Sequence, residues 1–173
     1  MSRPPADRDP LPGHFAATRV FPTRWADNDM YGHMNNAVYY QLFDTMINGW
    51  LATHAAVDPM ESTALNLVVE SGCRFFSEVG FPDDVLVGLN VARLGNSSVT
   101  YALGLFSLPR RPGTGADSGI DADAGTDADA DAPTLAALGN WVHVYVDAKT
   151  RRPTPIPASV RAALTPLVRE PRP

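Results

Sequence analysis

Acidic, amide and histidine side chains are concentrated in one short stretch near the start of the chain. From residue 27 to residue 40 it reads Asp-Asn-Asp-Met-Tyr-Gly-His-Met-Asn-Asn-Ala-Val-Tyr-Tyr. Gly32 permits a sharp backbone turn, and Asn35 or Asn36 is suited to cap a helix that starts directly after it. The free N–H groups of a helix start stabilise an oxygen that gains negative charge. With Asp29 just upstream, these are the parts that acyl transfer requires.

The elements that must position these residues are indicated by hydrophobic patterning. Apolar residues between 14 and 25, interrupted by Pro22, predict a first strand, with the proline at an edge or a bulge. Residues 36–52 predict the only long helix, and a short helix is expected at about 158–168. Further strands are predicted, with Gly95-Asn96 as a hairpin turn, at 64–76, 83–94, 97–108 and 136–147. This order predicts an α+β fold, with a five-stranded antiparallel sheet wrapped around one long central helix.

The predicted long helix is apolar on almost every side, which indicates burial on most sides. Asn36, Tyr40, Asp44 and Asn48 recur every four residues, so they form one polar stripe along it. Buried polar groups are costly unless they are hydrogen-bonded or face a ligand. The stripe is therefore either a set of side chains bonded to one another or part of the lining of a cavity.

The stretch from Asp27 to Tyr39 resembles the active-site segment of the hotdog-fold acyl-CoA thioesterases, in the 4-hydroxybenzoyl-CoA thioesterase superfamily. The shared pattern is Asp-x-Asp-x-x-Gly-His-x-Asn-Asn-x-x-Tyr. The resemblance implies the hotdog fold, in which two protomers join their sheets edge to edge and dimers often pair into tetramers. One helix cannot cover a five-stranded sheet alone, which also favours self-association as a dimer or tetramer.

The resemblance implies roles for the residues of this segment. The aspartate that matches Asp29 attacks the thioester carbonyl or activates a water that does so. The backbone N–H that matches Asn36 polarises that carbonyl. His33 is a catalytic candidate, and we favour a role in orienting the loop. Asp27 is expected to brace the loop rather than react, because two adjacent unpaired carboxylates would raise the pKa of one of them.

Substrate-binding residues are also implied. Asn35, Tyr39, Tyr40 and Asp44 are candidates to line the acyl or pantetheine channel, and Asp44 matches an aspartate that meets the phenol in hydroxybenzoyl-specific relatives. A bond from Asp44 to Tyr40 or Asn48 is at least as good an interpretation. The hairpin that meets the nucleotide of coenzyme A in relatives matches Arg93, Ser97 and Ser98. Because that turn holds few basic residues here, the phosphate contacts could instead come from Arg74, Arg110 or Arg151-Arg152.

These residues predict a thioesterase that hydrolyses acyl-CoA to a carboxylic acid and coenzyme A. No cofactor is expected, and no metal, since His33 lacks a second ligand nearby. An acyl-carrier-protein thioesterase and a non-catalytic acyl-CoA binding protein are the alternatives. There is no Gly-x-Ser-x-Gly sequence, which excludes an α/β-hydrolase thioesterase. Cys73 has no adjacent catalytic partner and is interpreted as a structural thiol.

Composition narrows the class of protein further. The net charge is −5, but residues 113–133 hold six aspartates; the rest of the chain has 13 acidic and 14 basic residues. This near-neutral balance argues against nucleic-acid binding. A single cysteine and the lack of a long apolar run predict a cytoplasmic protein without a membrane segment. Residues 1–12 are expected to form a disordered tail, followed by one domain at 13–170 with a disordered Asp/Ala-rich insertion at about 111–133.

Overall fold

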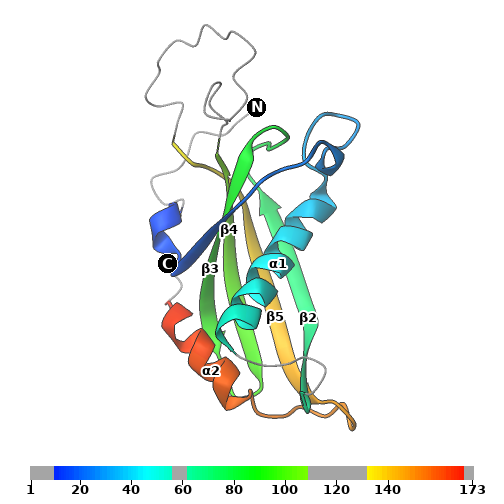
Figure 1. The fold of residues 1–173 in the computed structure, drawn as a ribbon, viewed down its shortest axis with the longest axis vertical. Helices are drawn as coiled ribbons and strands as arrows, with labels where there is room; N and C mark the ends of the chain where they lie inside the picture. Colours follow the sequence, from blue (N-terminus) through cyan, green and yellow to red (C-terminus); the bar gives the residue numbers. More distant parts are fainter. Residues whose placement is uncertain (1–9, 56–61, 109–131, 170–173) are drawn as a thin grey trace, which may run out of the picture.

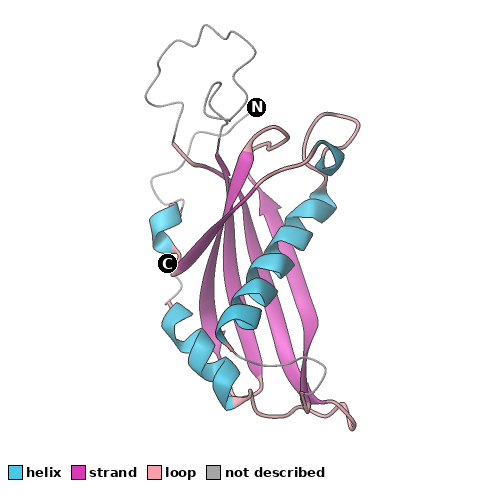
Figure 2. Ribbon diagram, in the orientation of Figure 1, coloured by secondary structure: helices cyan, strands magenta, loops and turns pink. Residues whose placement is uncertain are grey.

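A computed structural model gives the fold of the chain and describes residues 10–55, 62–108 and 132–169. Figure 1 labels the principal elements, and Figure 2 colours them by type. The strands are β1 (Ala17–Phe21), β2 (Ala64–Phe75), β3 (Asp84–Leu94), β4 (Ser98–Leu108) and β5 (Thr134–Asp147). The helices are α1 (Asn36–His54) and α2 (Ala158–Leu164), with short 3-10 turns at η1 (Pro12–His14), η2 (Trp25–Asp27) and η4 (Thr165–Leu167). Residues 1–9 of the predicted tail and nearly all of the predicted insertion lie outside the described residues.

The five strands form one antiparallel sheet in the order β1-β3-β4-β5-β2. The short β1 and the long β2 are therefore its two edges. Helix α1 lies across one face of the sheet, and α2 lies beside the lower end of α1 (Figure 1). The predicted α+β arrangement of five antiparallel strands and one long helix is confirmed.

The core lies between α1 and the sheet and fixes where the helix sits. Alternate residues of the central strands point toward α1, among them Leu89, Leu103 and Leu105, and all three are fully buried. Phe43 of α1 lies directly over Gly139 of β5, where an added Cβ would come within 2.6 Å of the Phe43 ring. The missing side chain at Gly139 therefore provides the space into which the helix packs, and the position of the helix start depends on it.

Part of the opposite face of the sheet, over β3 and β4, is contacted by the segment that precedes β1. The ring of Phe15 lies over Gly88 and Gly104, where an added Cβ would approach it to 2.3 Å and 2.5 Å. Phe15 also meets Phe106 edge to face, with 5.9 Å between the ring centroids. The side chain of Asn90 accepts a hydrogen bond from the backbone N–H of Ala16 at 2.7 Å. Together these contacts attach the start of the described chain to the sheet.

The structure differs from the sequence-based expectation in three places. The first strand is shorter than 14–25, because the chain forms 3-10 turns at 12–14 and 25–27. Trp25, expected in the strand, is 78% exposed. Helix α1 is not buried on most sides within one chain; only Tyr39, Phe43, Met46 and Ile47 are buried, because the sheet covers one face of the helix. The predicted C-terminal helix changes to a 3-10 turn at its end, where Pro166 offers no N–H.

Candidate active site

Asp29 closes the tight turn that precedes α1. Its Oδ1 accepts hydrogen bonds from the backbone N–H of Tyr31 at 2.8 Å and of His33 at 3.3 Å. The backbone N–H of Asp29 in turn donates to the carbonyl of His33 at 2.8 Å. Gly32 makes this turn possible, because its φ of +86° is a conformation that L side chains rarely adopt. The carboxylate is thus held in place through one oxygen, and these bonds leave Oδ2 for other chemistry.

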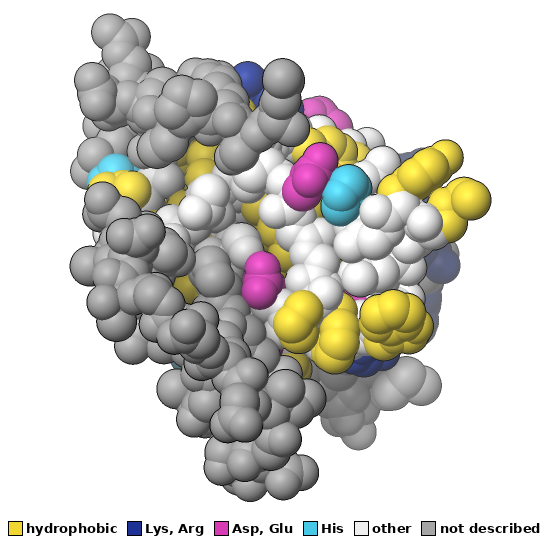
Figure 3. Space-filling model, turned by 90° about the horizontal axis from the view of Figure 1, so that it is seen from above, with side chains coloured by type: hydrophobic (Ala, Val, Ile, Leu, Met, Phe, Trp, Pro, Cys, Tyr) yellow, Lys and Arg dark blue, Asp and Glu magenta, His cyan; other side chains and the backbone are white. Residues whose placement is uncertain are grey.

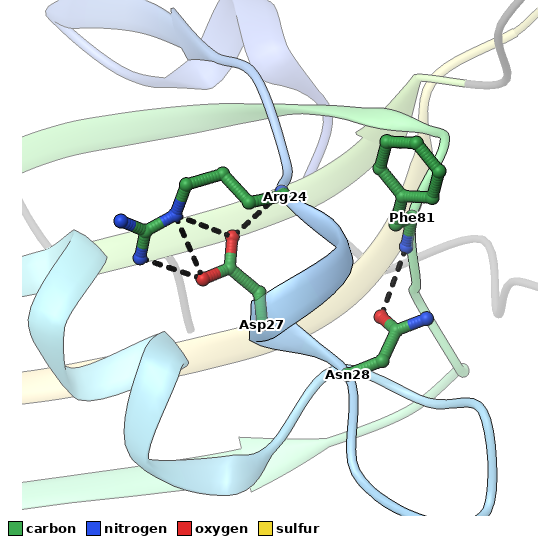
Figure 4. A network of polar contacts seen from close by, with 4 residues as sticks. All are labelled: Arg24, Asp27, Asn28 and Phe81. Atoms are coloured by element: carbon green, nitrogen blue, oxygen red, sulfur yellow. Dashed lines mark hydrogen bonds and ion pairs between the residues drawn. The ribbon is translucent and has the colours of Figure 1, made fainter.

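Asp27 has a different environment from Asp29. It is buried, and its carboxylate accepts hydrogen bonds from Nε, Nη2 and the backbone N–H of Arg24, the shortest at 2.7 Å (Figure 4). The hydrogen bonds from Arg24 hold the pKa of Asp27 below its ordinary value, so the carboxyl is ionised. The carbonyl of Asp27 also accepts from the N–H of Asn35 at 2.8 Å. Asp27 therefore braces the loop, in agreement with the expectation for it.

Asn35 caps the start of α1. Its Oδ1 accepts a hydrogen bond from the N–H of Ala37 at 2.9 Å, and its carbonyl accepts from the N–H of Val38 at 2.9 Å. Among the described residues, the backbone N–H of Asn36 has no hydrogen-bond partner. One donor at the positive end of the helix is therefore available to an oxygen from outside the chain.

The connection between β2 and β3 forms the second half of this site. The carbonyl of Val79 accepts from the N–H of Met34 at 2.6 Å. Asn28 Oδ1 accepts from the N–H of Phe81 at 3.0 Å (Figure 4). Glu78 Oε2 lies 3.2 Å from Nε2 of His33. The sequence does not indicate that Glu78 lies beside His33, because the two residues are far apart in the chain. The glycine and proline that flank Phe81 mark a tight connection, but they do not indicate what it packs against.

Large apolar side chains are exposed around the same loops. They are Trp25, Met30, Tyr31 and Phe81. Trp25 and Phe81 meet edge to face with their ring centroids 6.2 Å apart. Figure 3 looks down on the molecule from above and shows hydrophobic side chains at several places on that surface. Exposed groups of this kind are typical of a surface that contacts a ligand or another protein.

The remaining polar positions of α1 lie along the helix from this loop. Tyr39 is buried against Phe75, and burial raises the pKa of the Tyr39 phenol to about 12. Tyr40 packs on Trp141 of β5, with 6.2 Å between ring centroids. Asp44 Oδ1 accepts a hydrogen bond from Nδ2 of Asn48 at 2.9 Å. The polar stripe is therefore bonded within itself at Asp44, which was one of the two interpretations of the sequence.

A buried polar cluster lies beneath α1 and was not identified from the sequence. The indole N–H of Trp141 donates to Nε2 of His143 at 3.1 Å. Since an indole can only donate, a neutral His143 carries its proton on Nδ1. Asn66 Nδ2 lies 3.3 Å from Nδ1 of His143, and exchanging the nitrogen and oxygen of this amide gives an Nδ1–H the acceptor that it requires. Burial lowers the pKa of His143 to about 4, and the charge of Asp44 opposes that effect.

Tyr101 adjoins this cluster and leaves one polar group unsatisfied. Its ring meets His143 edge to face, with 5.3 Å between centroids. Its buried hydroxyl has no hydrogen-bond partner in the described part of the chain. Asp44 lies eight residues after Asn36, so the cluster is about 12 Å along the helix axis from the free amide. A buried hydroxyl without a partner is costly, and this position therefore favours an additional polar ligand or a water.

The predicted nucleotide-binding residues lie at the other end of the sheet. Val85 pairs with Phe21 next to the active loop, whereas Leu94 is nine residues further along β3, or about 30 Å away. Arg161 of α2 donates from Nη2 to the carbonyl of Gly95 at 2.7 Å, which holds the hairpin turn. Within one chain, Arg93, Ser97 and Ser98 are therefore not brought together with Asp29. Their contact with coenzyme A remains a prediction.

In residues 10–55, 62–108 and 132–169, no group of three or more His, Cys, Asp or Glu side chains is placed to hold a metal ion. Every helix in this part of the chain is too short or too polar to cross a bilayer. The expectation that the reaction needs no cofactor is not tested by the geometry.

Comparison with known proteins identifies the class of this fold and site. A family model described as the thioesterase-like superfamily matches residues 23–164, so the chain belongs to that superfamily. No curated protein matches the chain at a significant level.

Solved structures agree with this class. The PA5185 protein from Pseudomonas aeruginosa strain PAO1 is 37% identical, with a TM-score of 0.75 over 92% of this chain and 96% of its own. A 1,4-dihydroxy-2-naphthoyl-CoA thioesterase from Synechocystis is 16% identical, with a TM-score of 0.66 over 85% of this chain and 93% of its own. The SAV2348 protein from Staphylococcus aureus, solved in complex with CoA, is 17% identical, with a TM-score of 0.69 over 90% of this chain and 85% of its own. The fold is the hotdog fold of thioesterases, as the resemblance implied.

Proposed function

We propose that this protein is an acyl-CoA thioesterase, which hydrolyses acyl-CoA to a free carboxylic acid and coenzyme A. The proposal rests on two groups in the loop before α1 and at the start of that helix. Asp29 is fixed by backbone hydrogen bonds through one carboxylate oxygen, and the N–H of Asn36 has no partner among the described residues. A thioester carbonyl needs both a donor for its oxygen and an oxygen nucleophile or base for its carbon.

The two groups supply two routes to the same products. In the first, Oδ2 of Asp29 attacks the acyl carbon, the C–S bond breaks, and water then hydrolyses the anhydride. In the second, Asp29 takes a proton from a water whose oxygen attacks the acyl carbon, and the thiolate of coenzyme A leaves and is protonated. In both routes the Asn36 N–H donates to the carbonyl oxygen as it becomes negative.

The other predicted positions define how the substrate would lie. Asn35, Tyr39, Tyr40 and Asp44 would line the path of the acyl or pantetheine group along α1. His33 would orient the loop or act as a base. The nucleotide of coenzyme A would contact Arg93, Ser97 and Ser98, and the neighbour solved with CoA supports a CoA-containing ligand. Because these three residues lie far from Asp29 in one chain, we also propose that the active form is a dimer or tetramer.

The experiment that tests this function compares two aspartates with the same structural role. Asp147 also caps a turn, since its Oδ1 accepts from the N–H groups of Lys149 and Thr150 at 3.1 Å and 2.7 Å, but it lies at the far end of the sheet. We expect Asp29→Asn to lower thiol release from acyl-CoA at least about 100-fold, because asparagine keeps the turn bond and loses the charge. Asp147→Asn should leave the rate unchanged. The free thiol released from a panel of acyl-CoAs measures the hydrolysis rates of both variants.

Each alternative predicts a different result in the same assay. If Asp29 only caps its turn, Asp29→Asn and Asp147→Asn will have equal rates, and the assignment of Asp29 fails. Release from acyl-carrier-protein substrates but not from acyl-CoA indicates a carrier-protein thioesterase. Acyl-CoA affinity without thiol release indicates a binding protein.

A further inference from the structure

The β2–β3 connection and the Asp29 loop hold each other through backbone contacts. Besides the bonds from Met34 to Val79 and from Phe81 to Asn28, the two loops touch at Gly80. An added Cβ at Gly80 would lie 2.8 Å from the carbonyl oxygen of Gly32. The loop 28–34 is therefore closed on one side by residues 78–81, and the side chains of the two loops face each other at fixed positions.

The segment that carries Glu78 is also fixed from its other side. The N–H groups of Phe76 and Ser77 donate to the carbonyl of Ala136 at 2.8 Å and 3.4 Å, and the Ser77 hydroxyl donates to the carbonyl of Leu135 at 3.0 Å. Val79, the next residue after Glu78, is buried. Glu78 therefore extends from a backbone anchored to β5 before it and to the Asp29 loop after it.

His33 is held in the same way from its own side. Its backbone N–H donates to Asp29 Oδ1, and its carbonyl accepts from the N–H of Asp29. The charged or titratable groups around His33 are Asp29 on the same loop, Glu78 across from it, and Tyr39 on α1. The phenol of Tyr39 senses the charge of Glu78. Both side chains are partly exposed, His33 by 48% and Glu78 by 67%, and an exposed ion pair contributes little to stability. The arrangement therefore has little value as a stabilising contact.

We propose that Glu78 is a positioning residue of the active site, and that it acts by holding the imidazole of His33 in one orientation and one tautomer. This rests on the proposed thioesterase function. The carboxylate of Glu78 lies 3.2 Å from Nε2 of His33 as an ion pair, and its negative charge favours a proton on that nitrogen, which leaves Nδ1 as the unprotonated ring nitrogen.

The tautomer gives His33 a defined step in the reaction. When water attacks the carbon of the acyl-Asp29 anhydride, one O–H bond breaks and its proton moves to Nδ1. The new C–O bond forms, and the bond between the acyl carbon and the Asp29 oxygen breaks. The proton then passes from Nδ1 to the released carboxylate, and the ring returns to its neutral state. The negative charge of Glu78 stabilises the imidazolium that exists between these two transfers.

A double-mutant cycle tests whether Glu78 acts through His33. We expect Glu78→Gln to lower kcat about 10-fold with KM changed less than about twofold, because the charge and the tautomer control are lost while the loop contacts remain. His33→Gln should lower kcat at least as much, and the double variant should equal His33→Gln alone. Asp147→Asn is the control for kcat, because the Asp147 carboxylate caps a turn at the far end of the sheet from His33.

A second measurement does not need turnover. In the 15N spectrum of the imidazole at a pH where His33 is neutral, wild type should show the Nε2–H tautomer alone, and Glu78→Ala should show both tautomers. Mixed tautomers in an active wild-type enzyme, or independent effects of the two substitutions on kcat, would overturn the role of Glu78 and leave the proposed function standing. A wild-type protein that binds acyl-CoA and hydrolyses none would overturn both.

Discussion

At the scale of single residues, two aspartates separated by one position have different chemistry because different groups hold them. Asp27 is buried and saturated by the guanidinium and N–H of Arg24. Asp29 is held only by backbone N–H groups, through one of its two oxygens. A carboxylate whose oxygens are all engaged has no lone pair free to attack a substrate. The pattern Asp-x-Asp thus separates a structural acid from a candidate nucleophile by their partners.

His143 also owes its chemistry to its surroundings, since it is 1% exposed and is held between Trp141 and Asn66. Its pKa is about 4 in the folded protein and about 6.5 in an unfolded chain. Between these values the unfolded chain binds more protons, so stability rises with pH. The contribution of the neutral His143 ring to the free energy of unfolding is complete above about pH 6.5 and is lost as the pH falls toward 4.

We therefore expect the free energy of unfolding to fall by up to about 3 kcal/mol from this group between pH 6.5 and pH 4. In His143→Gln, which can still accept from Trp141, the part of the pH dependence due to this histidine should disappear. Urea unfolding at several pH values measures the free energy of unfolding of both proteins and hence its pH dependence. His54→Gln, at an exposed histidine of α1, should keep the wild-type pH dependence. Equal pH dependence in wild type and His143→Gln would show that His143 is not buried as a neutral ring.

At the scale of elements, the active loop depends on where α1 packs on the sheet. Phe43 fits over Gly139, and the N–H groups at the helix start lie two turns before Phe43. Any change that lifts the helix from β5 moves the Asn36 amide relative to Asp29. The geometry of the site therefore depends on a contact that contains no reactive group.

Gly139→Ala should lower the free energy of unfolding by about 1–3 kcal/mol, because its Cβ would overlap the Phe43 ring. It should also lower kcat, because the helix start must shift. Gly72→Ala on the adjacent strand is the control, since nothing lies within 4 Å of a Cβ there, and its effect on stability should stay within about 0.5 kcal/mol. Chemical denaturation compares the two variants, and equal stabilities would contradict this account of the helix contact.

The elements and the site differ in how far the sequence predicts them. The long helix, the four long strands and the Gly95-Asn96 hairpin were predicted within a few residues, because hydrophobic periodicity and turn residues are local signals. The turn at Asp29 and the cap at Asn35 were predictable for the same reason, since their partners lie within a few positions.

Glu78, Asn66 and His143 could not be predicted in this way. Strand pairing and loop packing bring each of them to its partners from distant segments. The short first strand was also missed, because apolar side chains at 15 and 25 suggested a longer strand. In the structure these residues instead cover the back of the sheet or lie exposed in a turn.

At the scale of the whole molecule, the edge strand β2 remains exposed. This edge strand exposes Leu67, Val68, Val69 and Phe75, although the apolar side chains of β3, β4 and β5 are largely buried. A long edge strand with exposed apolar side chains is a template for pairing with another chain. The proposed self-association would cover these side chains and extend the sheet.

We expect the wild-type protein to be a dimer or larger in solution, and Val69→Lys to shift it toward monomer. Val69 is 60% exposed on β2, and a lysine on an edge strand opposes pairing. Val20→Lys is the matched control on the opposite edge, where Val20 of β1 is 51% exposed, and it should not change the mass. Analytical ultracentrifugation measures the mass of the wild-type protein and of the two lysine variants. A monomeric wild type, or an equal effect of the two lysines, would contradict assembly through β2.

The attachment of Phe15 to the sheet has a practical consequence for anyone modifying this protein. Its ring fills the space above two opposed glycines on the side of the sheet away from α1. An affinity tag, a fluorophore or a surface tether joined ahead of Pro12 would therefore be attached next to a segment that packs on the side of the sheet away from α1. A truncation that removed Phe15 would instead uncover bare backbone at Gly88 and Gly104.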